Sequence, residues 1–194
     1  IHTRTASEVF GVPINKVTPE QRRVAKTANF AIIYGVSAFG LSQQTDMTPK
    51  EASMFIDIYF KRYPKVQEHL ENLIEKARKD GYVTTLLGRR RYIPEIESPN
   101  RQKREFAERV AINTPHQGSA ADLIKVVMIE IAEILRKKKS EMILQVHDEL
   151  VFEVHKSELE EIKEMVRDKM ENTVKLKVPI KVDVKIGKNW LETS

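Results

Sequence analysis

Residues 21–35, QRRVAKTANFAIIYG, carry two helical patterns at once. Cations and aromatic rings recur at every fourth position, at Arg22, Lys26, Phe30 and Tyr34. Apolar side chains take the spacing of a buried face, at Val24, Ala28, Ala31 and Ile32. Residues four apart on an α-helix lie near one face and climb about 6 Å per step. We therefore expect an amphipathic helix with an exposed row that runs from two cations to two rings.

Capping signals delimit the helices of the first half. Residues 18–21 (TPEQ) and 48–51 (TPKE) each combine an N-cap threonine, a first-turn proline and a Gln or Glu three residues after the cap. They predict helices that end near Gly35 and before Pro64. A third helix is predicted over residues 65–80.

The pattern changes after residue 81, where apolar alternation and turn residues predict strands as well as helices. A hairpin is expected over 82–96, followed by helices over about 100–112 and 118–138 that Pro115 and Gly118 separate. Two paired apolar runs are expected at 142–146 and 150–154. The last expected elements are a helix that is capped by Ser157 and Glu160 and ends near 172, and a strand over 178–187. The predicted fold class is helix-rich α+β, with the sheet mainly in the C-terminal half.

Composition sets limits on partners. The chain has 194 residues, of which 41% are hydrophobic and 31% charged, with a net charge of +5 and no cysteine. A positive balance favours polyanionic partners, and the length fits one domain or two small ones. No apolar run approaches the roughly 20 residues needed to cross a bilayer, so we expect no membrane partner.

The row from Arg22 to Tyr34 suits a ligand with phosphates at one end and a flat base at the other. Arginine offers a planar fork to phosphate oxygens, and lysine a compact point charge. Phe30 would lie against a base or sugar, and Tyr34 would close the far end. The alternative is an ordinary amphipathic helix with a solvated basic edge.

The stretch 145–153, QVHDELVFE, places Asp148 and Glu149 at a turn between two apolar runs. A carboxylate at a tight turn projects its oxygens toward solvent, where a hard cation can bind. The alternative is a hairpin whose turn happens to be acidic.

Three further segments carry polar or basic groups. In residues 108–125, Asn and Gln side chains could donate to the minor-groove acceptors that all base pairs share, or could belong to a helix kinked at Pro115. Residues 88–94, GRRRYIP, could contact phosphates or be simply solvated. The basic run 136–139 suits a helix C-terminus. We interpret the remaining histidines as structural or surface residues: His69, His116 and His155.

Two of these segments resemble the motifs of family A DNA polymerases of the bacterial DNA polymerase I type. Residues 21–35 match motif B, R-x-x-x-K-x-x-x-F/Y-x-x-x-Y-G, and residues 145–153 match motif C. The opening I-H-T-x-T-A resembles the segment that precedes motif B. The resemblance implies a DNA-directed DNA polymerase, with dNTP-binding residues His2, Arg22, Lys26, Phe30 and Tyr34.

The same resemblance assigns the chemistry and the DNA contacts. Asp148 would be a metal ligand of a site for two Mg²⁺ ions, with Glu149 and Lys26 as further catalytic residues. The implied DNA-binding residues are Arg23, Arg91, Arg109, Asn113, Gln117 and His147. Of these, His147 would contact the primer end.

The resemblance further implies fingers over residues 1–103, including the segment 18–35, and the C-terminal part of the palm over 104–194. The aspartate motif of the family, motif A, is absent from this sequence. We therefore expect motif A, with the thumb, in a preceding part of a longer chain, and we expect little or no polymerisation by residues 1–194 alone. The expected partners are primer-template DNA, dNTP and the remainder of the polymerase chain, in the cytoplasm with the nucleoid.

Other functions compete with this interpretation. A single-subunit RNA polymerase shares a related motif B, but Phe30 and the sequence of residues 147–150, HDEL, favour a DNA polymerase. A non-catalytic duplex-DNA-binding module would account for the absent motif A. A generic NTP-binding protein has no P-loop pattern to support it.

Overall fold

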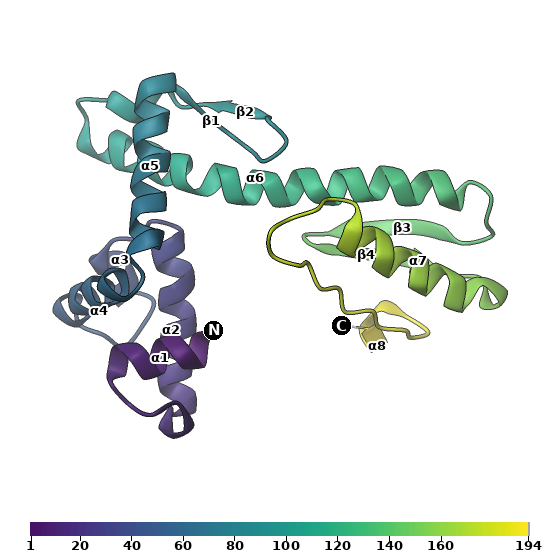
Figure 1. Ribbon diagram of the computed structural model, residues 1–194, viewed down its shortest axis with the longest axis horizontal. Coiled ribbons are helices and arrows are strands. Elements are labelled where there is room, and N and C mark those ends of the chain that lie inside the picture. The colour runs from purple at the N-terminus through teal and green to yellow at the C-terminus, as the bar shows by residue number, and fades with distance from the viewer. Residues whose placement is uncertain (194) are drawn as a thin grey trace. The chain divides into compact units, whose positions relative to one another are not determined.

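The computed structural model describes residues 1–193, which form two compact units that divide between residues 118 and 119. The first unit contains α1 (His2–Phe10), α2 (Pro19–Ile33), α3 (Ala38–Ser42), α4 (Pro49–Arg62), α5 (Pro64–Asp80), β1 (Tyr82–Thr84), β2 (Arg90–Tyr92) and the first part of α6 (Arg101–Leu135). The second contains the rest of α6, β3 (Glu141–Val146), β4 (Glu149–Glu153), α7 (Leu159–Asn172) and α8 (Trp190–Thr193). Short 3₁₀ turns occupy Ile14–Lys16, Pro94–Glu97 and Lys156–Glu158. Figure 1 shows this order along the chain. The predicted helix-rich α+β class is confirmed.

The two predicted capping boxes form at the starts of α2 and α4. The Thr18 side chain accepts from the backbone N–H of Gln21, and the Gln21 side chain accepts from the N–H of Thr18 in return. Thr48 and Glu51 repeat the arrangement. Each box satisfies two N–H groups that a helix start otherwise leaves without partners.

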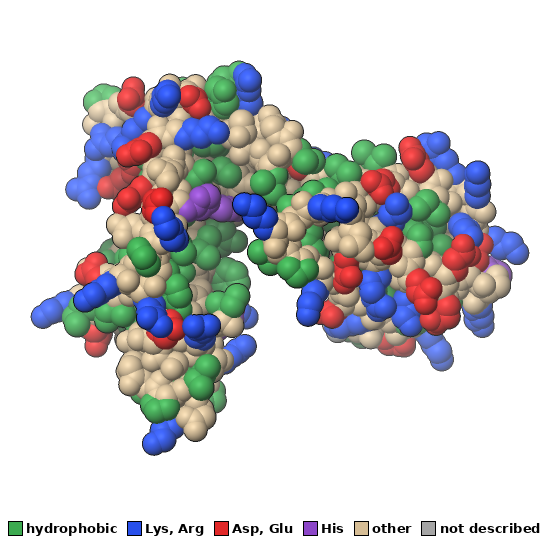
Figure 2. Space-filling model, in the orientation of Figure 1, with side chains coloured by type: hydrophobic (Ala, Val, Ile, Leu, Met, Phe, Trp, Pro, Cys, Tyr) green, Lys and Arg blue, Asp and Glu red, His purple; other side chains and the backbone are tan. Residues whose placement is uncertain are grey.

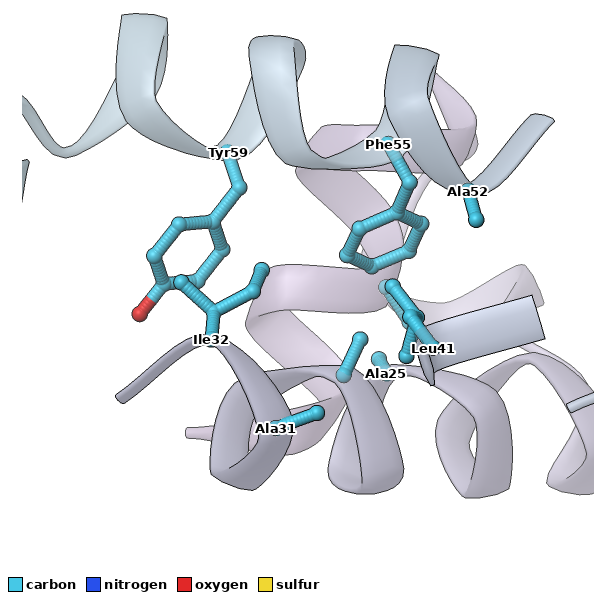
Figure 3. Packing of buried hydrophobic residues seen from close by; sticks show 9 residues of the cluster. Ala25, Ala31, Ile32, Leu41, Ala52, Phe55 and Tyr59 are labelled. Carbon is cyan, nitrogen blue, oxygen red and sulfur yellow. The ribbon is translucent and has the colours of Figure 1, made fainter. Parts of the chain in front are cut away.

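The largest core of the first unit lies between α2 and α4. Figure 3 shows Phe55 and Tyr59 of α4 pointing toward Ile32 of α2 and Leu41 of α3. Alanines on the facing side of α2 allow this approach, and Ala25 and Ala28 are fully buried. The apolar face predicted from the helical spacing is therefore the face that α2 buries.

A second core joins the β1–β2 hairpin to α5 and α6. The strands pair antiparallel, with Tyr82 opposite Tyr92. Val83 of β1 and Ala77 of α5 are buried against Ala107 and neighbouring residues of α6. The predicted hairpin is confirmed, and its core holds it against α6.

The prediction of two helices separated at Pro115 and Gly118 was wrong, because α6 runs without interruption over 35 residues. Proline removes one helical N–H, but burial of apolar side chains along a helix can outweigh that loss. Ala111 before the proline and Val127 after it are both buried. Gly118 has a packing role: a Cβ there would lie 2.7 Å from the Thr85 methyl group.

The second unit packs the β3–β4 hairpin against α7 and the last part of α6. Ile131 of α6 is fully buried, and Ile162 and Val166 of α7 pack in the same cluster. Met142 and Phe152, opposite each other on the two strands, lie against this cluster. The two paired apolar runs predicted for this region are confirmed.

Two predictions for the second unit were wrong. The Ser157 side chain hydrogen-bonds with His155 Nδ1 at 2.8 Å and does not cap α7, which begins at Leu159 with Glu158 as its N-cap residue. Residues 178–187 form no strand, although they alternate. Alternation is a property of side chains, whereas a strand needs a neighbour for its N–H groups. The N–H of Val182 instead donates to the carboxylate of Glu171.

On the face in Figure 2, acidic and basic side chains are interspersed. No helix within residues 1–193 is both long and apolar enough to cross a membrane. The structure divides into units after residue 118. The assignment of residues 1–103 to fingers and 104–194 to palm stays a prediction.

Candidate nucleotide and primer-template site

The predicted row is an exposed face of α2. Arg22, Lys26, Phe30 and Tyr34 are exposed, while Asn29 between them is buried. Half of Phe30 remains accessible, at 48%. Its ring lies parallel to that of Tyr34, with centroids 6.5 Å apart and an interplanar angle of 21°. The α2 surface therefore presents two cations and two aligned rings in the order that the sequence predicted.

His2 of α1 lies beside this row. Its ring centroid is 5.7 Å from that of Phe30. Burial, the N-terminal ammonium group, Arg22 and Lys26 lower the pKa of His2 below its ordinary value of 6.5. The structure thus brings together the five residues predicted to bind a nucleotide, and the electrostatics favour a neutral imidazole among the cations.

Arg23, predicted to bind DNA, faces away from the buried side and is engaged in ion pairs. Its guanidinium lies 2.6 Å from a carboxylate oxygen of Glu20 and 3.0 Å from one of Asp46. All three side chains are exposed, so the pairs exchange readily with solvent. A phosphate could replace either carboxylate as the partner of this cation.

The C-terminal end of α2 meets α6 at Gly35. Gly35 has φ +71°, and a Cβ there would lie 3.1 Å from Ile112 and 3.5 Å from the Arg109 side chain. Asn113 Nδ2 donates to the carbonyl oxygen of Tyr34 at 3.4 Å. Two of the predicted DNA-binding residues, Arg109 and Asn113, therefore lie beside the end of the row that runs from Arg22 to Tyr34.

Asn113 also has unused hydrogen-bonding capacity. Its Oδ1 atom is buried and has no hydrogen-bond partner among the described residues. Gln117, one helical turn further along α6, is exposed. An amide nitrogen carries two hydrogens, so Asn113 Nδ2 keeps one beyond its bond to Tyr34, and this donor and the exposed amide of Gln117 suit contacts with acceptors on base edges.

Arg91 of β2 is held against α6. Its guanidinium donates to the Thr114 hydroxyl at 3.2 Å. The contact fixes the hairpin next to the part of α6 that carries Asn113 and Gln117. Arg91 remains exposed and keeps further N–H groups for another acceptor.

Residues 147 and 148, the first two of the sequence His-Asp-Glu, form the turn of the β3–β4 hairpin in the second unit. Val146 and Glu149 pair across the strands, so His147 and Asp148 are the two central residues. His147 adopts φ +52°, and it is the single non-glycine residue with positive φ within residues 1–193. The Gln145 side chain donates to the His147 carbonyl at 2.6 Å. The turn thus holds a side-chain-bearing residue in a conformation that favours glycine.

The carboxylates of this turn can supply part of a metal site. Asp148 and Glu149 are exposed, and Mg²⁺ is held by one or two carboxylates together with water and substrate phosphates. Within the described part of the chain, no three His, Cys, Asp or Glu side chains are grouped to hold a metal ion. The carboxylates of Asp148 and Glu149 are suitable ligands for Mg²⁺, but they are only part of the ligand set that a metal site needs.

One functional candidate escaped the sequence analysis. Asn29 is 5% exposed and hydrogen-bonds with both His2 and Thr5. Its signal in the sequence was a polar amide at a position of α2 next to the buried alanines. A buried amide requires partners, but the sequence alone does not say which.

Comparison with known proteins places these features in a family. The sequence model described as DNA polymerase family A matches residues 1–192. DNA polymerase I of Caldicellulosiruptor bescii is 52% identical over 100% of this chain and 23% of its own length. DNA polymerase I of Mycobacterium tuberculosis strain H37Rv is 50% identical over 98% of this chain and 21% of its own length.

A solved structure agrees with this result. The POL domain of Pol1 from M. smegmatis, in complex with DNA primer-template and dNTP, matches with a TM-score of 0.91 and 48% identity. The match covers 97% of this chain and 34% of that chain. The chain thus spans less than a quarter of the two curated relatives' length. Family membership implies use of a divalent metal. The chain belongs to DNA polymerase family A.

Proposed function

We propose that this chain forms the fingers and the C-terminal part of the palm of a DNA-directed DNA polymerase. The boundary we propose follows the family resemblance, with fingers over residues 1–103 and palm over 104–194. Template-directed transfer of a nucleotide from dNTP to a primer 3′-hydroxyl is the proposed reaction. The observation that carries the proposal is the exposed row of α2, with His2 beside it, in a chain of this family.

The α2 row would bind the incoming dNTP. Arg22 and Lys26 are exposed cations one turn apart, suited to the triphosphate. Phe30 would pack on the sugar and base, and Tyr34, whose ring is aligned with that of Phe30, would occupy the template-base position while the fingers are open. Lys26 would also stabilise the charge that develops on the phosphates during transfer.

The β3–β4 turn would contribute to the metal site. Two Mg²⁺ ions would lower the pKa of the primer 3′-hydroxyl and neutralise charge on the leaving pyrophosphate. Asp148 would be a direct ligand, and Glu149 a second carboxylate nearby. His147 would contact the primer end. We propose that the aspartate of motif A, supplied by the remainder of the polymerase chain, completes the ligand set.

The α6 residues near Gly35 would hold the primer-template. Asn113 and Gln117 would contact acceptors of the minor groove, which are nearly independent of sequence. Arg109 would lie with them along the minor groove, while Arg23 and Arg91 would contact phosphates and fix the register. With DNA and dNTP as partners, we place the enzyme in the cytoplasm with the nucleoid.

The test is a chimaeric polymerase. Residues 1–194 replace the matching segment of the C. bescii DNA polymerase I. We expect the rest of that enzyme to supply motif A and the thumb. Extension of a primed template with dNTP and Mg²⁺ is measured, and dNTP is compared with rNTP. We expect template-dependent extension with a strong preference for dNTP.

Point variants of the chimaera test the roles. Lys26→Ala should raise the KM for dNTP and lower kcat, whereas Lys76→Ala, at an exposed lysine in the middle of α5, should change neither. Asp148→Asn should abolish extension and leave duplex binding intact. Full rate in Asp148→Asn would refute the metal assignment. Salt-dependent duplex binding that ignores dNTP and Mg²⁺, without extension, would favour the non-catalytic DNA-binding module.

A further inference from the structure

Asn29 connects the nucleotide row to α1 through two hydrogen bonds. Its Nδ2 atom lies 3.1 Å from Thr5 Oγ1 and 2.9 Å from His2 Nδ1. The amide is 5% exposed, so water cannot easily replace either partner. An amide nitrogen carries two hydrogens, and the two contacts use both.

The orientation of this amide is set by the groups behind Thr5. The single hydroxyl hydrogen of Thr5 points to the carbonyl of Ile1 at 3.4 Å or to the neighbouring Tyr63 hydroxyl. Tyr63 in turn donates to the carboxylate of Glu8. The pKa of Glu8 is lowered to about 2 by Arg62 and Tyr63, so this carboxylate accepts at neutral pH. Thr5 Oγ1 is therefore the acceptor for Asn29.

With the amide fixed, His2 Nδ1 must accept a hydrogen. A neutral imidazole carries one proton, and acceptance at Nδ1 places that proton on Nε2. The charged groups that act on His2 are the N-terminal ammonium and, on α2, Arg22 and Lys26. Arg62, the last residue of α4, and Tyr63, which follows it, bind Glu8 instead. Burial and these cations lower the pKa of His2, which favours the neutral ring.

We propose that Asn29 is a positioning residue that holds His2 in the Nε2–H tautomer, so that this ring donates a hydrogen bond to an oxygen of the bound triphosphate. The proposal rests on the proposed role of His2 in dNTP binding. A ring with the opposite tautomer would present a lone pair to the phosphates and repel them. Asn29 itself touches neither nucleotide nor metal in this arrangement.

The tautomer can be measured without any activity. The chain is labelled with ¹⁵N-histidine, and the ring nitrogens of His2 are assigned by comparison with His2→Gln. We expect a protonated Nε2 and an unprotonated Nδ1 at pH 7.5. Asn29→Asp, an isosteric change to an acceptor, should move the proton to Nδ1, and Asn29→Ala should give a mixture. A wild-type ring protonated on Nδ1 would overturn the proposal and leave the polymerase function untouched.

The consequence for dNTP use is measured in the chimaera between pH 6 and pH 9. The KM for dNTP should be nearly constant in the wild type. In Asn29→Asp it should rise on the order of tenfold as the imidazolium loses its proton, with kcat changed much less. The control is the same substitution in a His2→Gln background, where the pH dependence should vanish.

The outcomes separate the two hypotheses. If the tautomers are as expected but neither Asn29→Asp nor His2→Gln alters the KM, the positioning proposal is wrong. If the wild-type chimaera extends no primer, the proposed function fails, and the wild-type tautomer still tests the geometry. Should Asn29→Asp fail to fold, the wild-type spectrum and the His2→Gln kinetics decide between these outcomes.

Discussion

Among the side-chain-bearing residues of the described chain, His147 alone has a positive φ. Its φ of +52° falls at the first central position of a two-residue hairpin turn, where glycine is preferred. Residues held in such conformations cost about 1–3 kcal/mol each and concentrate at functional sites. Strain at the turn that carries Asp148 supports a functional role for the histidine.

Replacing this histidine by glycine should stabilise the protein. Relief of the strain outweighs the greater entropy loss of glycine, and we expect His147→Gly to raise the free energy of unfolding by about 0.5–1 kcal/mol. Urea denaturation measures the change. Asp148→Gly is the control, since Asp148 has no positive φ, and it should lower stability. Equal losses in the two variants would contradict the strain argument.

Glu8 is a second residue with a measurable signature. Hydrogen bonds from Arg62 and Tyr63 lower its pKa from an ordinary 4.5 to about 2. Because the folded-state pKa is the lower one, Glu8 contributes stability above pH 4.5, and this contribution is lost as the pH falls toward 2. Glu8→Gln should therefore be less stable than the wild type at pH 6, and the difference should shrink steadily below pH 4.5.

Thermal unfolding at several pH values tests this prediction. Glu68→Gln is a matched control, because Glu68 pairs with Lys65 in an exposed ion pair on α5. Such pairs contribute little, so this variant should follow the wild type at every pH. A destabilisation by Glu8→Gln that is as large at pH 2.5 as at pH 6 would show that the ionised carboxylate is not the cause.

At the scale of elements, α6 and the β1–β2 hairpin determine each other's positions. Gly118 lies against Thr85, and the Arg89 guanidinium donates to the Gly118 carbonyl at 3.2 Å. Gly118→Ala would place a Cβ 2.7 Å from the buried Thr85 methyl group. We expect a loss of about 1–3 kcal/mol in the free energy of unfolding, despite the higher helix propensity of alanine.

A double-mutant cycle identifies the cause of that loss. Thr85→Ser removes the methyl group and keeps the hydroxyl that accepts from the N–H of Arg89. In that background Gly118→Ala should be nearly neutral or stabilising. The same loss in both backgrounds would mean that the clash with Thr85 is not responsible.

The elements also show what local sequence determines. The capping boxes at Thr18 and Thr48 need only neighbouring residues, and both helices begin where the sequence predicted. The continuity of α6 depends on residues far apart in sequence, so Pro115 and Gly118 misled the prediction. The strand over 178–187 required a partner that alternation does not specify.

The candidate site follows the same division. The row from Arg22 to Tyr34 and the acidic turn at Asp148 are local patterns, and the structure has both. The contact between Asn29 and His2 joins residues 27 positions apart, and nothing in the spacing within either helix predicts it.

At the scale of the whole molecule, β3 exposes apolar side chains. Ile143, at the bulge between Met142 and Leu144, is 56% exposed, and Leu144 is also exposed. Exposed neighbouring apolar side chains often mark a surface that another protein segment covers. This arrangement supports the proposal that the remainder of the polymerase chain is a partner of residues 1–194.

Complementation in two pieces tests that partnership. We expect no primer extension by the 194-residue chain alone, because the proposed second catalytic aspartate is missing. Addition of a separately made piece of the C. bescii enzyme that carries motif A and the thumb should restore extension.

Ile143→Asp should lower the restored rate at limiting concentrations of that piece, because an aspartate on a covered apolar face must be desolvated. Met54→Asp, at a similarly exposed apolar residue of α4, should leave it unchanged. Equal rates for both variants would exclude this face of β3 from the assembly, whereas extension by the chain alone would mean that other carboxylates of residues 1–194 complete the metal site.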